Sequence, residues 1–473
     1  MKKISLIFIS AISTISVYTS CNKWLDVQPN SQIRDSELFE TEQGFKEALA
    51  GVYTILGNQS LYGGQLTYQM MGVLSKEWSN YSGLNYDDMA NYDYVATLPQ
   101  QYIENVWSNM YQAVSNTNNI LAKIDQYPVF RGDNYAIIKG EALALRAFIH
   151  FDLLRCFGAN YMVSPNQPAI PYVTRYTSKQ TNQSTVSETI TQILDDLIEA
   201  KKLLEKDPIF TGRVVTQLDD NGYLINRQVH LNYYAVEGLL ARIYLYIGQY
   251  DNAYASAKSV IDGNKFSFTT QANASSQTDL VGASEHLFAL NIFDLAQRSQ
   301  MFLEYGTDGI KFNLTQTQRL NYFDNDTDDY RYLYLFEGGA GADANNRYLL
   351  KYSESTSDDI YYQSKMPIIK LAEMYYILAE YANHTQTDAL PYFNAVRRAR
   401  GISELSTAPV DFRAFMTTEF RKEFIGEGQF FYYYKRLNQQ AILNGSHDMV
   451  AEKAYIFPLP DSEYEAANRV SNR

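Results

Sequence analysis

The sequence predicts a mainly α-helical protein, built as a stack of tetratricopeptide-like helical hairpins with long irregular loop insertions. The first observation is the stretch from Lys139 to Gly158, which is apolar on two opposite flanks when it is read as a helix. The second is a helix-turn-helix pattern that appears in residues 230–262 and again in residues 367–401. The third is composition, since 46% hydrophobic and 20% charged residues are typical of an ordered globular protein.

The stretch from Lys139 to Gly158 is the element around which we expect the chain to be organised. A helix that is apolar on two flanks needs a neighbour on each side, as a helix inside a stack of hairpins has. A buried helix of any other large α protein would show the same periodicity, so the pattern alone leaves both interpretations open. The two flanks consist of Leu143, Ala147, Phe151 and Leu154 on one side and Ala142, Leu145, Ile149, Leu153 and Cys156 on the other.

The first 20 residues are predicted to be an export signal. Two lysines precede an apolar stretch over residues 4–18, which is too short to remain as a membrane-spanning helix. Small residues stand directly before Cys21, as in a lipoprotein signal, where the cysteine is diacylated and becomes the first mature residue. The alternative is an ordinary secretory signal with an incidental cysteine. Residues 21–40 are expected to form an extended tether.

Charge and cysteine content restrict the class of protein further. Cys21 and Cys156 are the only cysteines, so an exported chain of this size must be stabilised by its core, and we expect Cys156 to be a small buried hydrophobe. The net charge is -13 and no basic run is present, which argues against nucleic acid as a partner.

Helical and irregular segments alternate along the mature chain. Thr41 is the predicted N-cap of the first helix, and helix is expected again over about 100–126, over the central stretch, and from Ser187 to near residue 205. Residues 207–229 suggest a small β-hairpin. Residues 58–99 and 264–365 lose helical periodicity, and long irregular segments inside a compact protein are usually functional.

The two repeated helix-turn-helix patterns share their turn chemistry. Gly248 is expected at the turn of the first unit, and Gly401 is expected to end the second. Thr387 is the predicted cap for the helix that carries Pro391 in its first turn. We therefore expect one domain over residues 41–473, in which the helices form a scaffold and the insertions 58–99 and 264–365 form the ligand-binding face.

Several ordered segments resemble the SusD/RagB family. They are WLDVQP after the leader, EALALRAFIHFDLLRCFG, PIIKLAEMYYILAEYAN with AVRRARG, EFRKEFIGEGQFFYYYKRL, and the terminal YIFPLPDSEYEAAN. These segments occur in the family's usual order and extend along the whole chain.

The resemblance implies a SusD-like fold and a glycan-binding lipoprotein at the outer face of a Gram-negative outer membrane. Such a protein would be attached to the membrane through lipid on Cys21 and would lie as a lid over a TonB-dependent SusC-like transporter. No acidic run follows Cys21, so surface display rests on the resemblance. Phe430 and Tyr433 stand where the family commonly has Arg and Asp, and Phe420 stands where a first Arg is usual, so we expect different local packing there.

Both insertions contain the residue types that bind sugars. A pyranose presents a C–H face that packs against an aromatic ring, and its hydroxyl groups bind amides and carboxylates. Trp78 is the strongest single candidate, although any of these aromatic residues could instead anchor its own loop. The first loop group is Trp78, Asn80, Tyr81, Tyr86 and Asp87, and the second loop group is Asn321, Tyr322, Asp326 and Tyr330.

Motifs for metals, cofactors and catalysis are weak. Residues 324–329 place oxygen ligands at alternate positions, as an EF-type calcium loop does, but Asp329 replaces the required Gly and Leu335 the required Glu. A solvated acidic turn is the better interpretation. The five histidines lack metal-ligand spacing, so we expect no metal and no cofactor. A carboxylate pair for glycoside hydrolysis has no sequence signature, so the sequence does not decide against a glycosidase.

The function that we expect is non-catalytic capture of oligosaccharide or polysaccharide for the partner transporter, so the protein is not expected to be an enzyme. Capture of peptides by the same architecture is the first alternative. A surface glycosidase and a helical-repeat adaptor that binds only protein are further alternatives.

Overall fold

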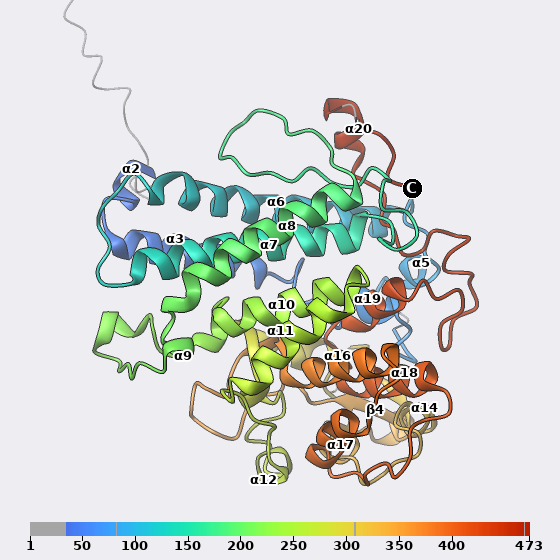
Figure 1. The fold of residues 1–473 in the computed structure, drawn as a ribbon. Coiled ribbons are helices and arrows are strands. Elements are labelled where there is room, and N and C mark those ends of the chain that lie inside the picture. Colours follow the sequence, from blue (N-terminus) through green and yellow to red (C-terminus); the bar gives the residue numbers. More distant parts are fainter. Residues whose placement is uncertain (1–34, 82, 307–308, 468) are drawn as a thin grey trace, which may run out of the picture.

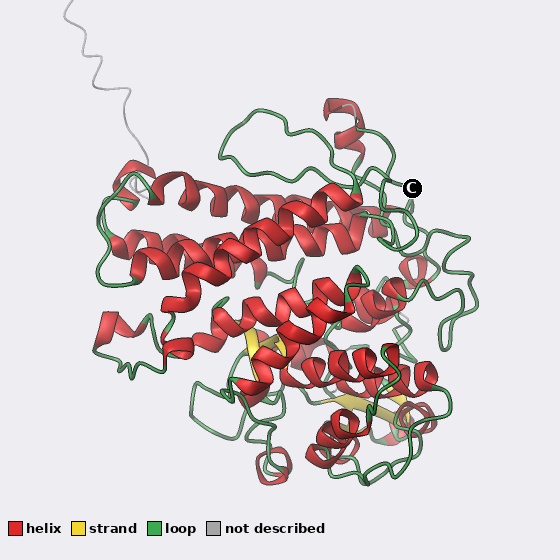
Figure 2. Cartoon of the chain, viewed as in Figure 1, coloured by secondary structure: helices red, strands yellow, loops and turns green. Residues whose placement is uncertain are grey.

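The computed structural model describes residues 35–81, 83–306, 309–467 and 469–473. The leader, Cys21 and most of the tether at 21–40 therefore lie outside the described residues. Helices dominate the described part of the chain, with two small groups of strands among them (Figure 2). The prediction of a mainly α fold is confirmed.

The first half of the chain forms a layer of long helices that lie alongside one another (Figure 1). Helix α6 packs against α3 and α7, and α7 packs against α8. Thr41 caps α3 as predicted, because its hydroxyl accepts a hydrogen bond from the N–H of Gly44 at 3.1 Å. The helices are α2 (Asp35–Leu38), α3 (Glu42–Leu56), α4 (Met70–Leu74), α5 (Asp87–Ala90), α6 (Thr97–Ile124), α7 (Asn134–Phe157) and α8 (Val186–Leu203).

Helix α7 is enclosed on both sides, as its sequence predicts. Every residue from 140 to 157 is buried, including the polar ones between the two apolar flanks. These polar side chains are paired: Arg146 binds Asp196 of α8 at 2.6 Å, and Arg155 binds Asp152 at 2.5 Å. Removing one member of such a pair would leave an uncompensated buried charge, so the pairs fix how the helices pack.

Cys156 of α7 is a buried thiol, also as predicted. Its sulfur lies 3.2 Å from the hydroxyl oxygen of Tyr432. Burial raises the pKa of Cys156 to about 12, so the thiolate form that reacts is strongly disfavoured.

The second half of the chain contains the two predicted helical hairpins. They are α10 with α11 and α16 with α17, and α11 packs against α16, so the hairpins stack. Gly248 and Gly401 follow α10 and α17, and both have a φ of +75°, which favours glycine. The helices are α9 (Pro208–Thr211), α10 (Tyr233–Tyr246), α11 (Tyr250–Asp262), α16 (Leu371–His384), α17 (Leu390–Ala399), α18 (Phe412–Glu423), α19 (Gln429–Arg436) and α20 (Asp461–Ala467).

The insertion at 264–365 contains short helices and two small antiparallel sheets. Strand β1 (His286–Asn291) pairs with β5 (Lys365–Lys370), and β4 (Asn346–Leu349) lies between β2 (Leu314–Thr315) and β3 (Phe336–Gly338). The apolar pieces of this insertion are thus strands, which pair with partners distant in the sequence. Its helices are α12 (Gln271–Ser275), α13 (Leu295–Phe302), α14 (Gln316–Tyr322) and α15 (Tyr330–Tyr334).

Three local predictions are wrong. Residues 207–229 form α9 and short 3₁₀ turns instead of a β-hairpin, because Asp220 and Asn221 both adopt left-handed backbone conformations. Thr387 does not cap α17, since the carboxylate of Asp388 accepts the N–H of Leu390 at 2.9 Å. Within the expected loop 58–99, residues 61–75 are all buried and belong to the core.

Among the residues that the structure describes, no helical stretch has the length and hydrophobicity that a bilayer crossing requires.

Candidate ligand-binding face

The two insertions meet at a short backbone junction. The N–H of Ser79 donates to the carbonyl of Asn313 at 2.8 Å, and Asn80 forms an antiparallel bridge with the same residue. The N–H of Thr315 donates to the hydroxyl of Ser79 at 3.1 Å. Residues that lie more than two hundred positions apart in the sequence are therefore side by side, and we call this contact the junction.

Trp78 lies under the junction instead of on its surface. Its side chain is 4% exposed, and its indole N–H donates to the carbonyl of Tyr68 at 2.7 Å. The ring packs against Phe312, with 5.8 Å between ring centroids. A Cβ at Gly72 would lie 2.5 Å from Nε1 of Trp78, so the helix backbone approaches the indole closely. The ligand-stacking role predicted for Trp78 needs an exposed ring face, which this structure does not offer.

Tyr86 is buried in the same way. It is 4% exposed, its hydroxyl accepts a hydrogen bond from Gln65 at 2.8 Å, and it donates to Gln69 at 3.1 Å. Its ring stacks on Tyr102, with 5.3 Å between centroids. The hydroxyl of Tyr86 is therefore hydrogen-bonded, and its ring packed, within the protein.

Three members of the first loop group reach the surface. Asn80 and Tyr81 are half-buried, and Asp87 is exposed at the start of α5. Partial burial, together with the charge of Asp87, raises the pKa of Tyr81. Gly83 lies against Ile310, because a Cβ there would come within 2.4 Å of Cδ1 of Ile310.

Ile310 is 46% exposed and adds an aliphatic group from the second insertion. The sequence does not predict this contribution, since nothing around residue 310 distinguishes Ile310 from any other loop residue. We call the surface formed by Asn80, Tyr81, Asp87 and Ile310 the junction patch. It combines one ring, one amide, one carboxylate and one alkyl side chain.

Tyr322, in the second loop group, is held by Arg421. Tyr322 is 4% exposed, and its hydroxyl donates to the carbonyl of Arg421 at 3.1 Å. The Arg421 guanidinium donates to the carbonyls of Tyr322 and Asn321, and lies 4.7 Å from the Tyr322 ring centroid. The faces and the hydroxyl of this ring are therefore occupied. Asn321 is exposed beside it, and Asp326 is half-buried.

Tyr330 faces a different cavity, of about 480 Å³, whose lining includes no member of the first loop group. The Tyr330 hydroxyl donates to Gln271 at 3.2 Å, and its ring lies where a Cβ on Gly401 would be. The structure thus places Tyr330 at a cavity that the first loop group does not line, and each group has both buried and accessible members.

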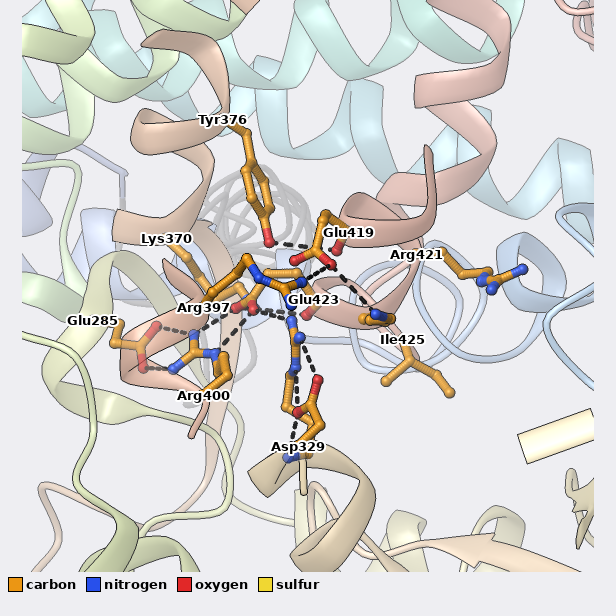
Figure 3. A network of polar contacts seen from close by, with 12 residues as sticks. Glu285, Asp329, Lys370, Tyr376, Arg397, Arg400, Glu419, Arg421, Glu423 and Ile425 are labelled. Carbon is orange, nitrogen blue, oxygen red and sulfur yellow. Dashed lines mark hydrogen bonds and ion pairs between the residues drawn. The ribbon is translucent and has the colours of Figure 1, made fainter. Parts of the chain in front are cut away.

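The inner wall of that cavity is a buried network of ion pairs centred on Glu423 (Figure 3). Glu423 binds Arg400 at 2.8 Å, Lys370 at 2.9 Å and Arg331 at 2.8 Å. Arg400 also binds Glu285 at 2.6 Å. Burial alone would raise the pKa of Glu423, but the charges of Arg400, Lys370 and Arg331 hold that pKa well below its ordinary value.

The aromatic substitutions noted in the sequence lie beside this network and do not disrupt it. Phe420 stacks between Phe424 and Tyr433, with centroid distances of 4.2 and 4.5 Å. Phe430 packs on Tyr434 at 4.2 Å. The cations of the network come from β5 and from the ends of α15 and α17, so the carboxylates stay paired even with aromatic residues at positions 420, 430 and 433.

The acidic run at 324–329 does not form a calcium loop in this structure. Asp329 is buried, caps α15 and binds Arg331 at 2.6 Å. Over residues 35–81, 83–306, 309–467 and 469–473, no group of three or more His, Cys, Asp or Glu side chains is placed to hold a metal ion.

Two family profiles match consecutive halves of the chain. The first, described as starch-binding and associating with the outer membrane, matches residues 23–245. The second, described as the SusD family, matches residues 242–471. Among curated proteins, SusD-like protein P38 of Formosa agariphila is 25% identical over 279 residues, which are 57% of this chain. The chain matches about half of that relative's length, since the aligned region covers 47% of it.

Several solved structures superpose on nearly the whole chain. A SusD superfamily protein from Bacteroides thetaiotaomicron superposes with a TM-score of 0.72 at 24% identity, covering 92% of this chain and 100% of that one. A SusD-like carbohydrate binding protein from Bacteroides vulgatus superposes with a TM-score of 0.71 at 21% identity, covering 90% of this chain and 97% of that one. A laminarin binding SusD-like protein superposes with a TM-score of 0.68 at 19% identity, covering 92% of this chain and 99% of that one. These likenesses establish the fold, and the two profiles account for residues 23–471, so the chain belongs to the SusD/RagB family.

Proposed function

We propose that this protein captures oligosaccharide at the outer-membrane surface without cutting it and delivers it to a partner TonB-dependent, SusC-like transporter. The observation that carries the proposal is the match of the two family profiles, one of which is described as starch-binding and associating with the outer membrane. The names of two structural neighbours, carbohydrate binding and laminarin binding, support a glycan as the ligand.

The junction patch is our proposed ligand contact. Tyr81 would pack against the C–H face of a sugar ring, Ile310 would extend that apolar surface, and Asn80 and Asp87 would bind hydroxyl groups. Asn321, Asp326 and Tyr330 would contribute further contacts from the second loop group. Trp78, Tyr86 and Tyr322 would support these loops from beneath, because each is buried and hydrogen-bonded.

The proposed layout of the mature protein follows the sequence. Residues 1–20 would be removed, Cys21 would carry lipid, residues 21–40 would form a tether, and residues 41–473 would form one domain with its ligand face at 58–99 and 264–365. Replacing Cys21 with alanine should move the protein from the membrane fraction to the soluble fraction of cells that process lipoproteins. Continued membrane association of Cys21→Ala would contradict a lipid anchor at this position.

A glycan panel tests the proposed activity. The purified chain is titrated with starch-derived and laminarin-derived oligosaccharides by calorimetry, and each mixture is then analysed by chromatography. Binding of at least one glycan with no change in its chain length supports capture. Shortened products would indicate a glycosidase, and binding of peptides in place of every glycan would indicate peptide capture.

Delivery to a transporter needs its own test. Affinity purification of the protein from gently solubilised outer membranes should recover a TonB-dependent barrel in a fixed ratio. Recovery of the protein without any barrel, under conditions that preserve other membrane complexes, would contradict the proposed partner.

A further inference from the structure

A groove of about 1080 Å³ runs along the outer side of α3, and only one residue of its lining, Asn291, belongs to either insertion. The opposite wall is the turn at 220–222, in which three successive residues have φ values of +55°, +53° and +79°. The wall on α3 is a row of exposed side chains spaced four, three and four residues apart, namely Gln43, Glu47, Ala50 and Thr54. Eleven residues of helix extend about 16 Å, so the groove is elongated.

The floor of the groove is built on a buried carboxylate. Glu141 of α7 is fully buried and accepts hydrogen bonds from the hydroxyls of Tyr53 at 2.6 Å and Tyr223 at 2.8 Å. It also binds Nδ1 of His230 at 2.5 Å and the guanidinium of Arg227 at 3.3 Å. Burial alone would raise the pKa of Glu141, but the charges of His230 and Arg227 hold it at about 2, so the carboxylate stays ionised.

His230 is fixed in orientation by these contacts. An ionised carboxylate only accepts hydrogen bonds, so Nδ1 of His230 carries the proton. The imidazole lies nearly perpendicular to the rings of Tyr53 and Tyr223, at 89° and 75°. Its side chain is 19% exposed and lines the groove, and no hydrogen bond joins its Nε2 to another residue that the structure describes. Nε2 is therefore an oriented hydrogen-bonding atom at the floor of the groove.

The charges around the groove restrict the ligand. The ammonium of Lys46 is already bound to Glu42 at 2.7 Å and to Asp220. Glu47 adds a further carboxylate to the lining. An anionic ligand would find no cation here that is not already paired, whereas a neutral ligand rich in hydroxyl groups could bind amides, carboxylates and the imidazole.

We propose that this groove is a second oligosaccharide subsite, in which a hydroxyl group of a neutral glycan forms a hydrogen bond with Nε2 of His230. The inference rests on the proposed function and extends it, because it adds a site on the helical scaffold, separate from the junction patch. Tyr53 and Tyr223 form the apolar part of the floor, and the exposed row on α3 with Asn221 opposite supplies further hydrogen-bonding groups.

Calorimetric titration with malto-oligosaccharides and with laminarin oligosaccharides tests the subsite. The critical variant is His230→Asn, since the amide nitrogen of asparagine can replace Nδ1 as the donor to Glu141 while the hydrogen-bonding atom Nε2 is lost. Asn221→Gly removes a wall side chain at a position where glycine suits the positive φ. Thr54→Val removes a hydroxyl from the opposite wall with little change in shape.

The wild type should bind two molecules of a short neutral glycan, or one longer molecule whose affinity depends on both sites. His230→Asn should weaken the groove site at least about tenfold, as expected for one lost hydrogen bond in a partly desolvated site. Asn221→Gly and Thr54→Val should weaken it less, and Tyr81→Ala should weaken only the other site. Thermal unfolding of each variant confirms that the fold is intact.

Two outcomes would overturn the inference. If Tyr81→Ala weakens all of the glycan binding that is measured, and the three groove variants leave affinity and stoichiometry unchanged, the groove is not a subsite while the proposed function stands. If the wild type binds neither glycan, the proposed function fails together with the subsite. A preference of the groove for sulfated over neutral oligosaccharides would also contradict the charge argument.

Discussion

The scaffold interior and the junction patch use the same kinds of polar residue in opposite ways. Around Glu423 and along α7, carboxylates and guanidinium groups are buried, and each is matched by oppositely charged partners at 2.5 to 2.9 Å. At the junction patch, Asn80, Tyr81 and Asp87 reach the surface. Buried polar groups are expensive unless they are paired, so the first set fixes the packing, whereas the second lies at the surface, where we propose that the ligand binds.

Two aromatic residues only three positions apart, Trp78 and Tyr81, differ in the same way. Trp78 is 4% exposed and hydrogen-bonded to backbone, whereas Tyr81 is half-buried at the surface. Residue type therefore does not decide which ring meets the ligand. We propose that the direction of each side chain relative to the junction decides it, and the following experiments test that division.

The largest effect is expected from breaking the buried ion network. Glu423→Ala should lower the free energy of unfolding by about 3–5 kcal/mol, because Arg400, Lys370 and Arg331 would lose their shared carboxylate. Denaturant unfolding measures the change. Glu404→Ala is the matched control, since Glu404 pairs with Arg398 on the surface, and such exposed pairs contribute about 0–1 kcal/mol. Equal losses in both variants would contradict the contrast between buried and exposed pairs.

Truncating the buried indole should have a similar or slightly smaller effect. Trp78→Ala should cost about 3–4 kcal/mol of unfolding free energy, through lost burial and the cavity that remains. Any loss of glycan affinity should follow the loss of folded protein. A stable Trp78→Ala variant with weakened glycan binding would assign Trp78 to the ligand.

Glu77 links the junction to the ion network and should give a pH-dependent effect. Burial raises the pKa of Glu77 from 4.5 to about 7, although the N–H of Gly426 and the hydroxyl of Ser75 bind its carboxylate. The folded state therefore holds this proton more tightly than the unfolded state. The stabilisation is present at low pH and is lost as the pH rises through about 7.

Glu77→Gln should remove that dependence, because glutamine keeps an acceptor for Gly426 and does not titrate. Relative to the wild type, the unfolding free energy of Glu77→Gln should rise by on the order of 2 kcal/mol between pH 5 and pH 8. Unfolding curves for both proteins at several pH values give the difference. Parallel pH profiles would show that Glu77 does not titrate in this range.

The scaffold could be predicted from the sequence because its signals are local. The two-flanked apolar pattern of α7, the cap at Thr41 and the glycines at 248 and 401 each specify a structure through nearby residues. The strands in 264–365 had no such signal. Strand β1 pairs with β5, whose residues lie about eighty positions away, and this contact is invisible to periodicity.

The candidate site could be located from the sequence only as two segments. The insertions were identified by their loss of periodicity, and they do meet at Ser79 and Asn313. The sequence could not show that Trp78 and Tyr322 turn inward or that Ile310 lies beside Gly83, since side-chain direction in irregular backbone follows from tertiary packing. The groove lined by Tyr53 and His230 could not be predicted, because its parts come from α3, the turn at 220–223 and the segment before α10.

The most direct test of the account is the glycan affinity of Tyr81→Ala, measured by calorimetry beside its unfolding free energy. We expect affinity to fall by about 1–2 kcal/mol, as for the loss of one stacked ring, while stability changes by less than about 1 kcal/mol. Unchanged affinity for every glycan that the wild type binds would contradict the assignment of the ligand to the junction patch.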